Sequence, residues 1–240
     1  MRVAVLSDIH ANLAALDAVL AVMPSVDGVW QLGDVVGYGP DPDEVVARLR
    51  DIGATGVRGN HDAAALGGLE MESFNVDARR AMEWTRGVIT DETRAWLGSL
   101  PELLELEGFT LVHGSPRDPV WEYVITTPVA RAAIAAMPTA FGLNGHTHLP
   151  VAYLDEDGHL ETMSPGSGSR IVFEGRRALL NPGSVGQPRD GIPAASWLLL
   201  DTEERAATWQ RTAYDVAAVQ GRMAGLGLPA RLVERLAYGL

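Results

Sequence analysis

Residues 2–10, RVAVLSDIH, decide the fold of this chain. A short apolar run that ends in polar residues is typical of a buried strand in a parallel sheet. Leucines then recur at helical spacing over residues 13–20, a second apolar run follows at 28–32, and another helical face occupies 45–52. Because strand and helix patterns alternate with short connections, the sequence predicts a layered α/β domain built from βαβ units.

The middle and the end of the chain add further helices and, after residue 150, mainly short strands. Further helices are expected at 76–86, 91–100, 127–137, 214–225 and 228–238, and a loop is expected at 67–75. Further strands are expected at 103–106, 109–112, 151–154, 170–173, 178–180, 196–200 and 206–211. Without an internal repeat or a long linker, the sequence predicts one domain over residues 1–240, with the helices at 214–240 as an appendage.

The composition limits the chemistry that is available. The chain has 240 residues, a formal net charge of −12, 47% hydrophobic residues and no cysteine. This length and apolar content allow a sizeable core and exclude wholesale disorder. The lack of cysteine excludes disulfides, thiolate metal sites, iron–sulfur clusters and cysteine nucleophiles. A metal ion must therefore be held by oxygen and imidazole ligands.

The charge balance and one uncharged stretch bear on partners and location. With 31 acidic and 19 basic residues, the chain lacks the basic surface that an extended nucleic acid needs. A small anionic substrate stays compatible, because bound divalent cations reverse the local charge. Residues 132–154 contain no Lys, Arg, Asp or Glu, but Pro138 and Asn144 argue against a lipid-exposed helix. Because Asp8 interrupts the apolar start, we expect no secretory signal and a cytoplasmic protein that does not enter the membrane.

Five of the six histidines lie in short polar motifs at the ends of predicted strands. The motifs are Asp8-Ile-His10, Gly33-Asp34, Gly59-Asn-His-Asp62, His113-Gly114 and Gly145-His-Thr-His148. In open α/β sheets, the loops at the carboxyl ends of the strands converge on one crevice. Oxygen and imidazole ligands suit Mn, Fe, Co, Ni or Zn better than Cu(I) or Ca. The sequence therefore predicts a divalent metal site at this crevice.

The spacing inside the motifs supports this hypothesis. Residues i and i+2 at a strand end point the same way, so Asp8 and His10 are expected to face one ion. Glycines at 33, 59 and 145 permit tight turns where the ligands are presented.

Each motif taken alone also has a structural explanation. Asp34 could cap a helix, Asn60 could be the left-handed residue of a turn, and His113 could be a hydrogen-bonded core histidine. Five such motifs at five successive element ends favour the metal site over these alternatives. His159 lies outside the motifs and is expected on the surface.

In their order, these motifs resemble those of the calcineurin-like metallophosphoesterase superfamily, and in particular its compact prokaryotic branch of phosphodiesterases and phosphatases. The resemblance includes Asn181-Pro-Gly-Ser-Val-Gly186 and covers about residues 1–215. It implies an α/β fold, a four-layer α/β/β/α sandwich with two mixed sheets, and a dinuclear metal centre.

The resemblance also implies a role for each motif residue. The implied ligands are Asp8, His10 and His148 for the first ion, Asn60, His113 and His146 for the second, and Asp34 as the bridge. His61 would be the general acid and Asp62 would orient it. The expected cofactors are two divalent ions, with Mn²⁺ favoured and Fe, Ni, Co or Zn as alternatives.

These inferences lead to one functional hypothesis and several alternatives. We expect hydrolysis of a small, nucleotide-like phosphodiester or phosphoanhydride by attack of a metal-bridging water. A phosphomonoesterase, a non-catalytic interaction scaffold on the same fold, a DNA nuclease of the superfamily and a purely structural metal site stay open as alternatives. The complete ligand set argues against the scaffold, and the acidic charge argues against the nuclease. The sequence leaves the oligomeric state open.

Several residues near the motifs are candidates for contact with the substrate. They are Arg58 for a phosphate, Tyr38, Met71 and Phe74 for an apolar wall, and Trp121 and Tyr123 for a stacked base. The alternative for Arg58 is an ion pair with an acidic neighbour. The alternative for the apolar and aromatic residues is ordinary core packing. Asn181, Gly183 and Ser184 are expected to shape a tight turn near the site.

Overall fold

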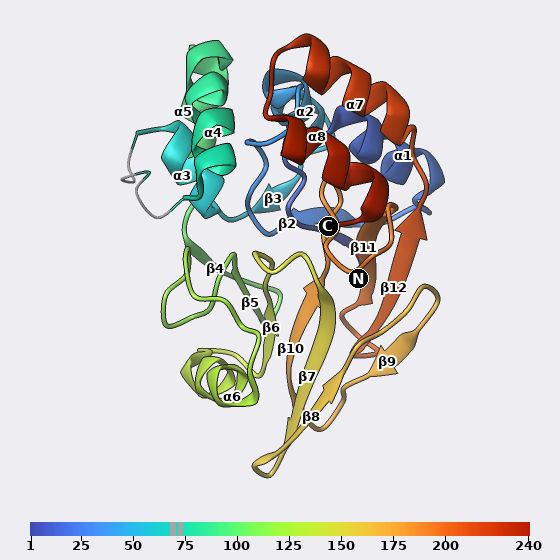
Figure 1. Ribbon diagram of the computed structural model, residues 1–240. Coiled ribbons are helices and arrows are strands. Elements are labelled where there is room, and N and C mark those ends of the chain that lie inside the picture. Colours follow the sequence, from blue (N-terminus) through green and yellow to red (C-terminus); the bar gives the residue numbers. More distant parts are fainter. Residues whose placement is uncertain (68–70, 72–73) are drawn as a thin grey trace.

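The computed structural model describes residues 1–67, 71 and 74–240 (Figure 1). Part of the loop predicted at 67–75 lies outside these residues. The helices are α1 Leu13–Val22, α2 Pro42–Asp51, α3 Asn60–Ala65, α4 Val76–Val88, α5 Asp91–Ser99, α6 Thr127–Ala136, α7 Val216–Gly225 and α8 Ala230–Arg235, followed by a 3₁₀ turn at Leu236–Tyr238. The strands are β1 Arg2–Leu6, β2 Gly28–Gln31, β3 Thr55–Gly56, β4 Leu103–Leu106, β5 Phe109–Val112, β6 Phe141–Leu143, β7 Pro150–Glu156, β8 His159–Met163, β9 Arg170–Val172, β10 Arg177–Pro182, β11 Ala195–Asp201 and β12 Ala206–Thr212.

The strands form two mixed sheets. The first has the order β3-β2-β1-β11-β12-β9, and the second has the order β4-β5-β6-β10-β7-β8. In the first sheet β1, β2 and β3 run parallel, and β11 joins β1 in antiparallel register. In the second sheet β5, β6 and β10 run parallel, whereas β4 and β7 pair with them antiparallel. Each sheet therefore has a parallel portion whose strands end on one side.

The two faces of β1 show how the layers are separated. Val3 and Val5 are fully buried between the sheets, in one apolar cluster with Leu111 of β5. Ala4 and Leu6 point to the other face and join the cluster beneath α1 and α2. Because β1 is buried on both faces, its sequence is a continuous apolar run and not an alternating one.

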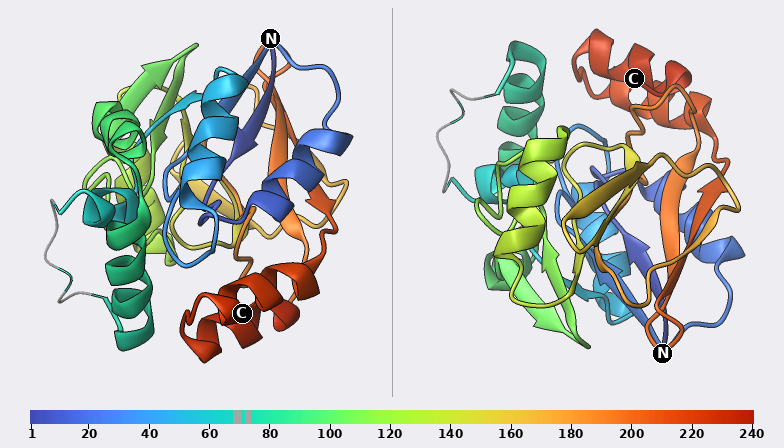
Figure 2. Two further views of the ribbon diagram at one scale, coloured as in Figure 1. Left: turned by 90° about the horizontal axis from the view of Figure 1, so that it is seen from above. Right: turned by 90° about the horizontal axis from the view of Figure 1, so that it is seen from below.

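A third apolar cluster completes the sandwich. Ile134 of α6 packs with Tyr153 and Leu179 on the outer face of the second sheet. The order of layers is helices, sheet, sheet and helix, as the two views in Figure 2 show. This arrangement confirms the predicted four-layer α/β/β/α fold with two mixed sheets.

The C-terminal helices α7 and α8 lie together at one end of the molecule (Figure 2). Val219, Met223, Leu232 and Leu236 are buried in the same cluster as α1 and α2. That residues 1–240 form one domain with 214–240 as an appendage stays a prediction.

The sequence patterns missed four short elements. Two of them, β3 and β6, contain only two and three residues, and each includes a glycine. The edge strand β8 is mostly exposed and has no apolar alternation. The helix α3 begins inside the Gly59-Asn-His-Asp62 motif. There the carboxylate of Asp62, the third residue of the helix, accepts from the Gly59 N–H. An acidic residue at this position of a helix is the sequence signal that could have predicted α3.

The uncharged stretch 132–154 is divided among α6, β6 and β7. None of the helices in the described part of the chain combines the length and apolarity that a membrane span requires.

Candidate metal centre

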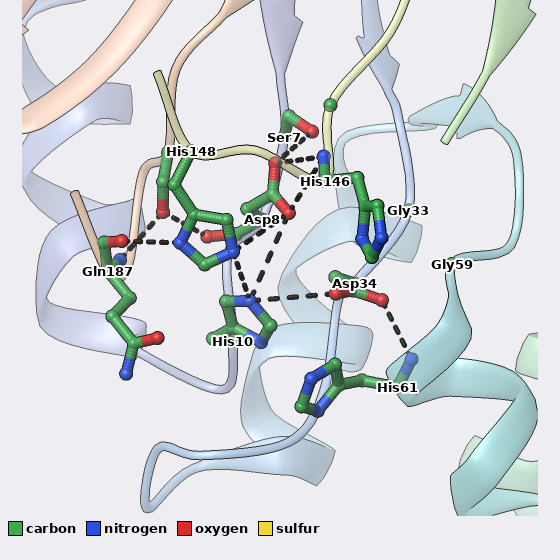
Figure 3. A network of polar contacts seen from close by, with 12 residues as sticks. Ser7, Asp8, His10, Gly33, Asp34, Gly59, His61, His146, His148 and Gln187 are labelled. Atoms are coloured by element: carbon green, nitrogen blue, oxygen red, sulfur yellow. Dashed lines mark hydrogen bonds and ion pairs between the residues drawn. The ribbon is translucent and has the colours of Figure 1, made fainter. Parts of the chain in front are cut away.

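The polar motifs converge where the parallel strands of both sheets end (Figure 3). Asp8 and His10 follow β1, and Asp34 follows β2. The motif at 60–62 opens α3 after β3, His113 follows β5, and the 146–148 motif lies between β6 and β7. Five loops from two sheets thus bring polar side chains to one buried space, as the strand-end argument predicts.

A first group of donors consists of Asp8, His10, Asp34 and His148, all buried. The Nε2 atoms of His10 and His148 lie 3.1 Å apart. The Nε2 of His148 is 3.2 Å from the Asp8 Oδ1, and the Nε2 of His10 is 3.7 Å from the Asp34 Oδ2. These side chains could hold one cation.

A second group consists of Asp34, His113 and His146, also buried. The Nε2 of His113 lies 3.0 Å from the Nδ1 of His146 and 3.3 Å from the Asp34 Oδ2. The Oδ1 of Asn60 is 3.1 Å from the same Nε2. Asp34 belongs to both groups, and its Oδ2 faces a histidine of each.

The hydrogen bonds at the outer side of the rings test whether a cation fits here. The Nδ1 atoms of His10, His113 and His148 face the backbone carbonyls of Val36, Leu32 and Gln187. Donation to these carbonyls fixes the tautomer and turns the Nε2 lone pairs inward, as is usual for metal-binding histidines. Lone pairs that face one another at about 3 Å repel unless a cation or a proton lies between them. The donor set therefore fits divalent cations.

One imidazole nitrogen of the site lacks a hydrogen-bond partner among the described residues. The Nε2 of His146 is buried and has no hydrogen-bond partner among the described residues. Such an atom is costly unless a ligand completes the site.

The pKa values of the site residues are shifted by burial and by the close approach of carboxylates and imidazoles. Burial opposes ionisation of Asp34, but His113 and the other histidines hold its pKa well below the ordinary value. Burial also disfavours the imidazolium of His113, yet Asp34 and Asp8 raise its pKa to about 9. Burial and the charge of His113 lower the pKa of His146 to about 3. The raised pKa of His113 favours its protonated form in the absence of a cation.

The backbone of the ligand loops is strained. Five candidate ligands have positive φ, and they are Asp8 (52°), His10 (50°), Asp34 (53°), His146 (67°) and His148 (61°). Residues other than glycine rarely adopt this conformation, and each costs about 1–3 kcal/mol. Because β1 already ends at Leu6, the convergence of the candidate ligands Asp8 and His10 comes from left-handed turns and not, as expected, from strand alternation.

Two of the motif glycines permit close approach and not a positive φ. A Cβ at Gly59 would lie 2.2 Å from the Asp34 Oδ1, and one at Gly145 would lie 2.0 Å from the Ser7 Oγ. Only Gly33 of the three has the left-handed backbone (φ +88°) that was expected of a tight turn.

Several polar side chains hold the ligand loops together. The Ser7 Oγ donates to the Asp8 Oδ2, and the Ser184 Oγ donates to the Asp8 carbonyl. Asn181 donates to the carbonyl of Gly145. The turn at 181–186 thus supports two ligand loops, whereas Ser7 carried no sequence signal beyond its place next to a ligand.

His61 and Asp62 lie at the start of α3, beside Asp34 and His10. The His61 backbone N–H donates to the Asp34 Oδ1 at 2.8 Å, and its Nδ1 lies 3.1 Å from the Met82 sulfur. The carboxylate of Asp62 accepts from the backbone N–H groups of Gly59 (3.0 Å) and Val36 (3.1 Å). Among the hydrogen bonds of the described residues, the Asp62 carboxylate is thus bound to the backbone at the start of α3 and not to the His61 ring.

Among the candidate substrate contacts, Arg58 pairs with Glu102 at 3.0 Å, the alternative that the sequence left open. Tyr38 and Phe74 are buried, and their rings lie 4.3 and 4.9 Å from the His61 ring. Both line the site and also join the core cluster.

The other candidates differ in exposure. Tyr123 is 46% exposed and stacks on His146 at 3.7 Å, so it lies at the open side of the site. Trp121 and Met71 are half-buried against the core. His159 lies on β8 and is exposed, away from both donor groups.

Comparison with known proteins agrees with this geometry. Residues 1–205 match the model of the calcineurin-like phosphoesterase superfamily domain, so fold and site define a metal-dependent phosphoesterase. The chain belongs to the calcineurin-like phosphoesterase superfamily, and it is a phosphoric ester hydrolase. The resemblance read from the sequence motifs is thereby confirmed.

Individual relatives match over different lengths. A metallophosphoesterase of Sphaerobacter thermophilus has a crystal structure with a TM-score of 0.92 and 40% identity, covering 100% of this chain and 99% of that one. An uncharacterized protein of Methanocaldococcus jannaschii is 36% identical, covering 99% of this chain and 98% of that protein. A symmetrical bis(5'-nucleosyl)-tetraphosphatase of Pectobacterium atrosepticum is 32% identical over 117 residues, which are 47% of this chain and 42% of that protein.

The proton on His113 leads to a prediction about metal binding. A cation that binds the His113 Nε2 must displace this proton, because only the neutral imidazole is a ligand. Since the pKa of His113 is about 9, we expect metal affinity to rise up to about tenfold per pH unit between about pH 6.5 and 8.5. Calorimetry in buffers with different ionisation enthalpies should detect the released proton.

The matched control is Asp34→Asn, which removes the charge that holds the proton. The residual metal affinity of this variant should vary less with pH, because the pKa of His113 is no longer raised by Asp34. Wild-type affinity that is independent of pH over this range, with no proton released, would contradict the assignment of His113 as a ligand.

Proposed function

We propose that this chain is a dinuclear metal-dependent phosphoesterase that hydrolyses a small, nucleotide-like phosphodiester or phosphoanhydride. The observation that carries the proposal is the position of Asp34, whose carboxylate belongs to both donor groups. A carboxylate shared between two sets of ligands is what a pair of neighbouring cations requires.

The residues of the site divide into holding and reacting groups. In the proposal, Asp8, His10 and His148 hold one ion, Asn60, His113 and His146 hold the other, and Asp34 bridges them. Bound divalent cations supply Lewis acidity, because they attract phosphoryl oxygens, activate water and screen developing charge. Mn²⁺ is the proposed metal, although the donor set also suits Fe, Co, Ni and Zn.

His61 is the proposed general acid. Its ring lies 4.8 Å from the ring of His10, so it faces the same space without belonging to either donor group. Burial lowers the pKa of His61 to about 4, so the imidazole is neutral before substrate binds. An anionic ester placed against the ring favours the imidazolium, because opposite charges attract. His61 then donates its proton to the leaving oxygen.

The relatives support the substrate class. Three proteins that match about two fifths of this chain or more are named symmetrical bis(5'-nucleosyl)-tetraphosphatases. These are enzymes for small phosphorylated molecules, and we propose the same class of substrate here. We also propose a cytoplasmic location and no extended nucleic acid or membrane as partner. A phosphomonoesterase is the second candidate, because the same ions and the same acid would serve it.

A panel of three substrates tests the proposal. Protein loaded with Mn²⁺ should hydrolyse bis-p-nitrophenyl phosphate or a dinucleoside tetraphosphate faster than p-nitrophenyl phosphate. Asp34→Asn should show no measurable turnover and reduced metal content. Faster turnover of the monoester would favour the phosphomonoesterase, and metal-loaded protein inactive on all three would contradict the proposal.

His61→Ala separates the acid from the ligands. Metal content should stay near wild type, while turnover of esters with poor leaving groups should fall by about 10²–10⁴-fold, the usual contribution of a general acid. Esters of p-nitrophenol should lose less, because their leaving group needs little protonation. His159→Ala, at an exposed position on β8, is the control and should change neither. Loss of metal in His61→Ala would show that His61 is a ligand.

A further inference from the structure

Two arginines lie beside the metal-binding residues without being among them. Arg189 belongs to the segment between β10 and β11, and Arg235 is the last residue of α8. The Nη2 of each guanidinium donates to the side-chain oxygen of Gln187, at 3.4 Å from Arg189. The backbone carbonyl of Gln187 accepts from the His148 Nδ1, and Figure 3 shows the two side by side. One residue thus connects both arginines to the cluster.

The ion pairs among the described residues include neither guanidinium group. Within the described residues, neither Arg189 nor Arg235 has a carboxylate oxygen within 4.0 Å. Asp190, the neighbour of Arg189 in sequence, pairs instead with Arg211.

At least one N–H donor of each arginine is unused among the described residues. The Nε atoms of Arg189 and Arg235 are buried and have no partner among the described residues. A guanidinium has five N–H donors, and the shared oxygen of Gln187 satisfies one from each. Burial also lowers the pKa of Arg235 below its ordinary value. An anion that accepts from both groups would offset the cost of burying them.

Both arginines lie close to the reacting space. The Cζ of Arg235 is 4.8 Å from the centre of the Tyr38 ring, and that ring is 4.3 Å from the ring of His61. The Nη2 of Arg189 donates to Gln187, whose backbone carbonyl accepts from the His148 Nδ1. An anion bound at the proposed cations would therefore lie close to the positive charges of Arg189 and Arg235.

We propose that Arg189 and Arg235 bind a second phosphoryl group of the substrate, next to the group that the metal site holds. Planar guanidinium groups bind phosphoryl oxygens through parallel N–H donors. A monoester or a simple diester has one phosphoryl group, whereas a phosphoanhydride has at least two in succession. The inference rests on the proposed function and narrows its substrate to phosphoanhydrides. It also gives α8 a part in the site.

The alternative is a purely structural role, in which the contacts to Gln187 only dock α8 on the loop. Leu232 and Leu236 already bury this end of the chain in the core cluster. The alternative predicts equal effects on all substrates, so substrate comparison distinguishes the two roles.

The test compares Arg189→Gln and Arg235→Gln with two substrates. For a dinucleoside tetraphosphate, kcat/KM should fall roughly ten- to hundredfold per arginine, the usual worth of a hydrogen bond to a charged group. For bis-p-nitrophenyl phosphate, kcat/KM should stay near wild type. Arg231→Gln is the control, because this exposed arginine lies one turn earlier on the same helix.

A second readout needs no turnover. Inorganic pyrophosphate should raise the melting temperature of the Mn²⁺-loaded protein more than orthophosphate does, and each variant should lose the difference. If Arg235→Gln does not fold, Arg189→Gln, which changes no helix, still decides the outcome.

Three results would overturn the inference: equal losses on both substrates, no loss on either, or no preference of the wild-type protein for pyrophosphate over orthophosphate. If the wild-type protein hydrolyses no ester of the panel, the proposed function fails. The melting-temperature comparison still tests the anion site in that case, so the two failures are distinguishable.

Discussion

The contact on which the structure depends is the carboxylate of Asp34 between two groups of inward-facing histidines. Its Oδ2 lies 3.3 Å from the His113 Nε2 and 3.7 Å from the His10 Nε2, and its Oδ1 accepts from the His61 backbone N–H. Each of these partners comes from a different loop. A buried carboxylate without compensation would be very costly, so the sheets and loops around it are arranged to supply positive charge and donors.

Hydrogen bonds between the loops offset the strain of their left-handed backbone. Left-handed backbone at five candidate ligands and inward-turned imidazoles are unfavourable in isolation. The loops are fixed by bonds from one to the next, such as Asp8 N–H to the Gly33 carbonyl and His10 N–H to the Asp34 carbonyl. The close approach of Gly59 to Asp34 leaves no room for a side chain. A site fixed in this way is already arranged for cations before they bind.

The sequence predicted the layered fold and most of its helices and strands, because the apolar periodicity of strands and helices is local. It also predicted which polar residues meet, because each lies a few positions after a strand end. It could not predict how the rings are oriented. The partners of the Nδ1 atoms are the backbone carbonyls of Leu32, Val36 and Gln187. Every residue has a backbone carbonyl, so the residue type does not indicate which one accepts the hydrogen bond.

Other features depended on contacts between distant segments. Asp62 was expected to orient His61, and the sequence could not predict that its carboxylate accepts from the backbone N–H groups of Gly59 and Val36. Arg189 and Arg235 meet at one glutamine from separate elements, and neither lies in a recognisable motif. Short strands such as β3 carry too few residues for a periodic pattern. Such features become visible only when the sheets are assembled.

The measurement that tests the shared carboxylate most directly is anomalous scattering from crystals grown with Mn²⁺. Two manganese peaks should flank Asp34 at roughly 3.5–4 Å from each other, one near His10 and His148 and the other near His113 and His146. A single peak, or peaks that do not contact Asp34, would contradict the dinuclear centre.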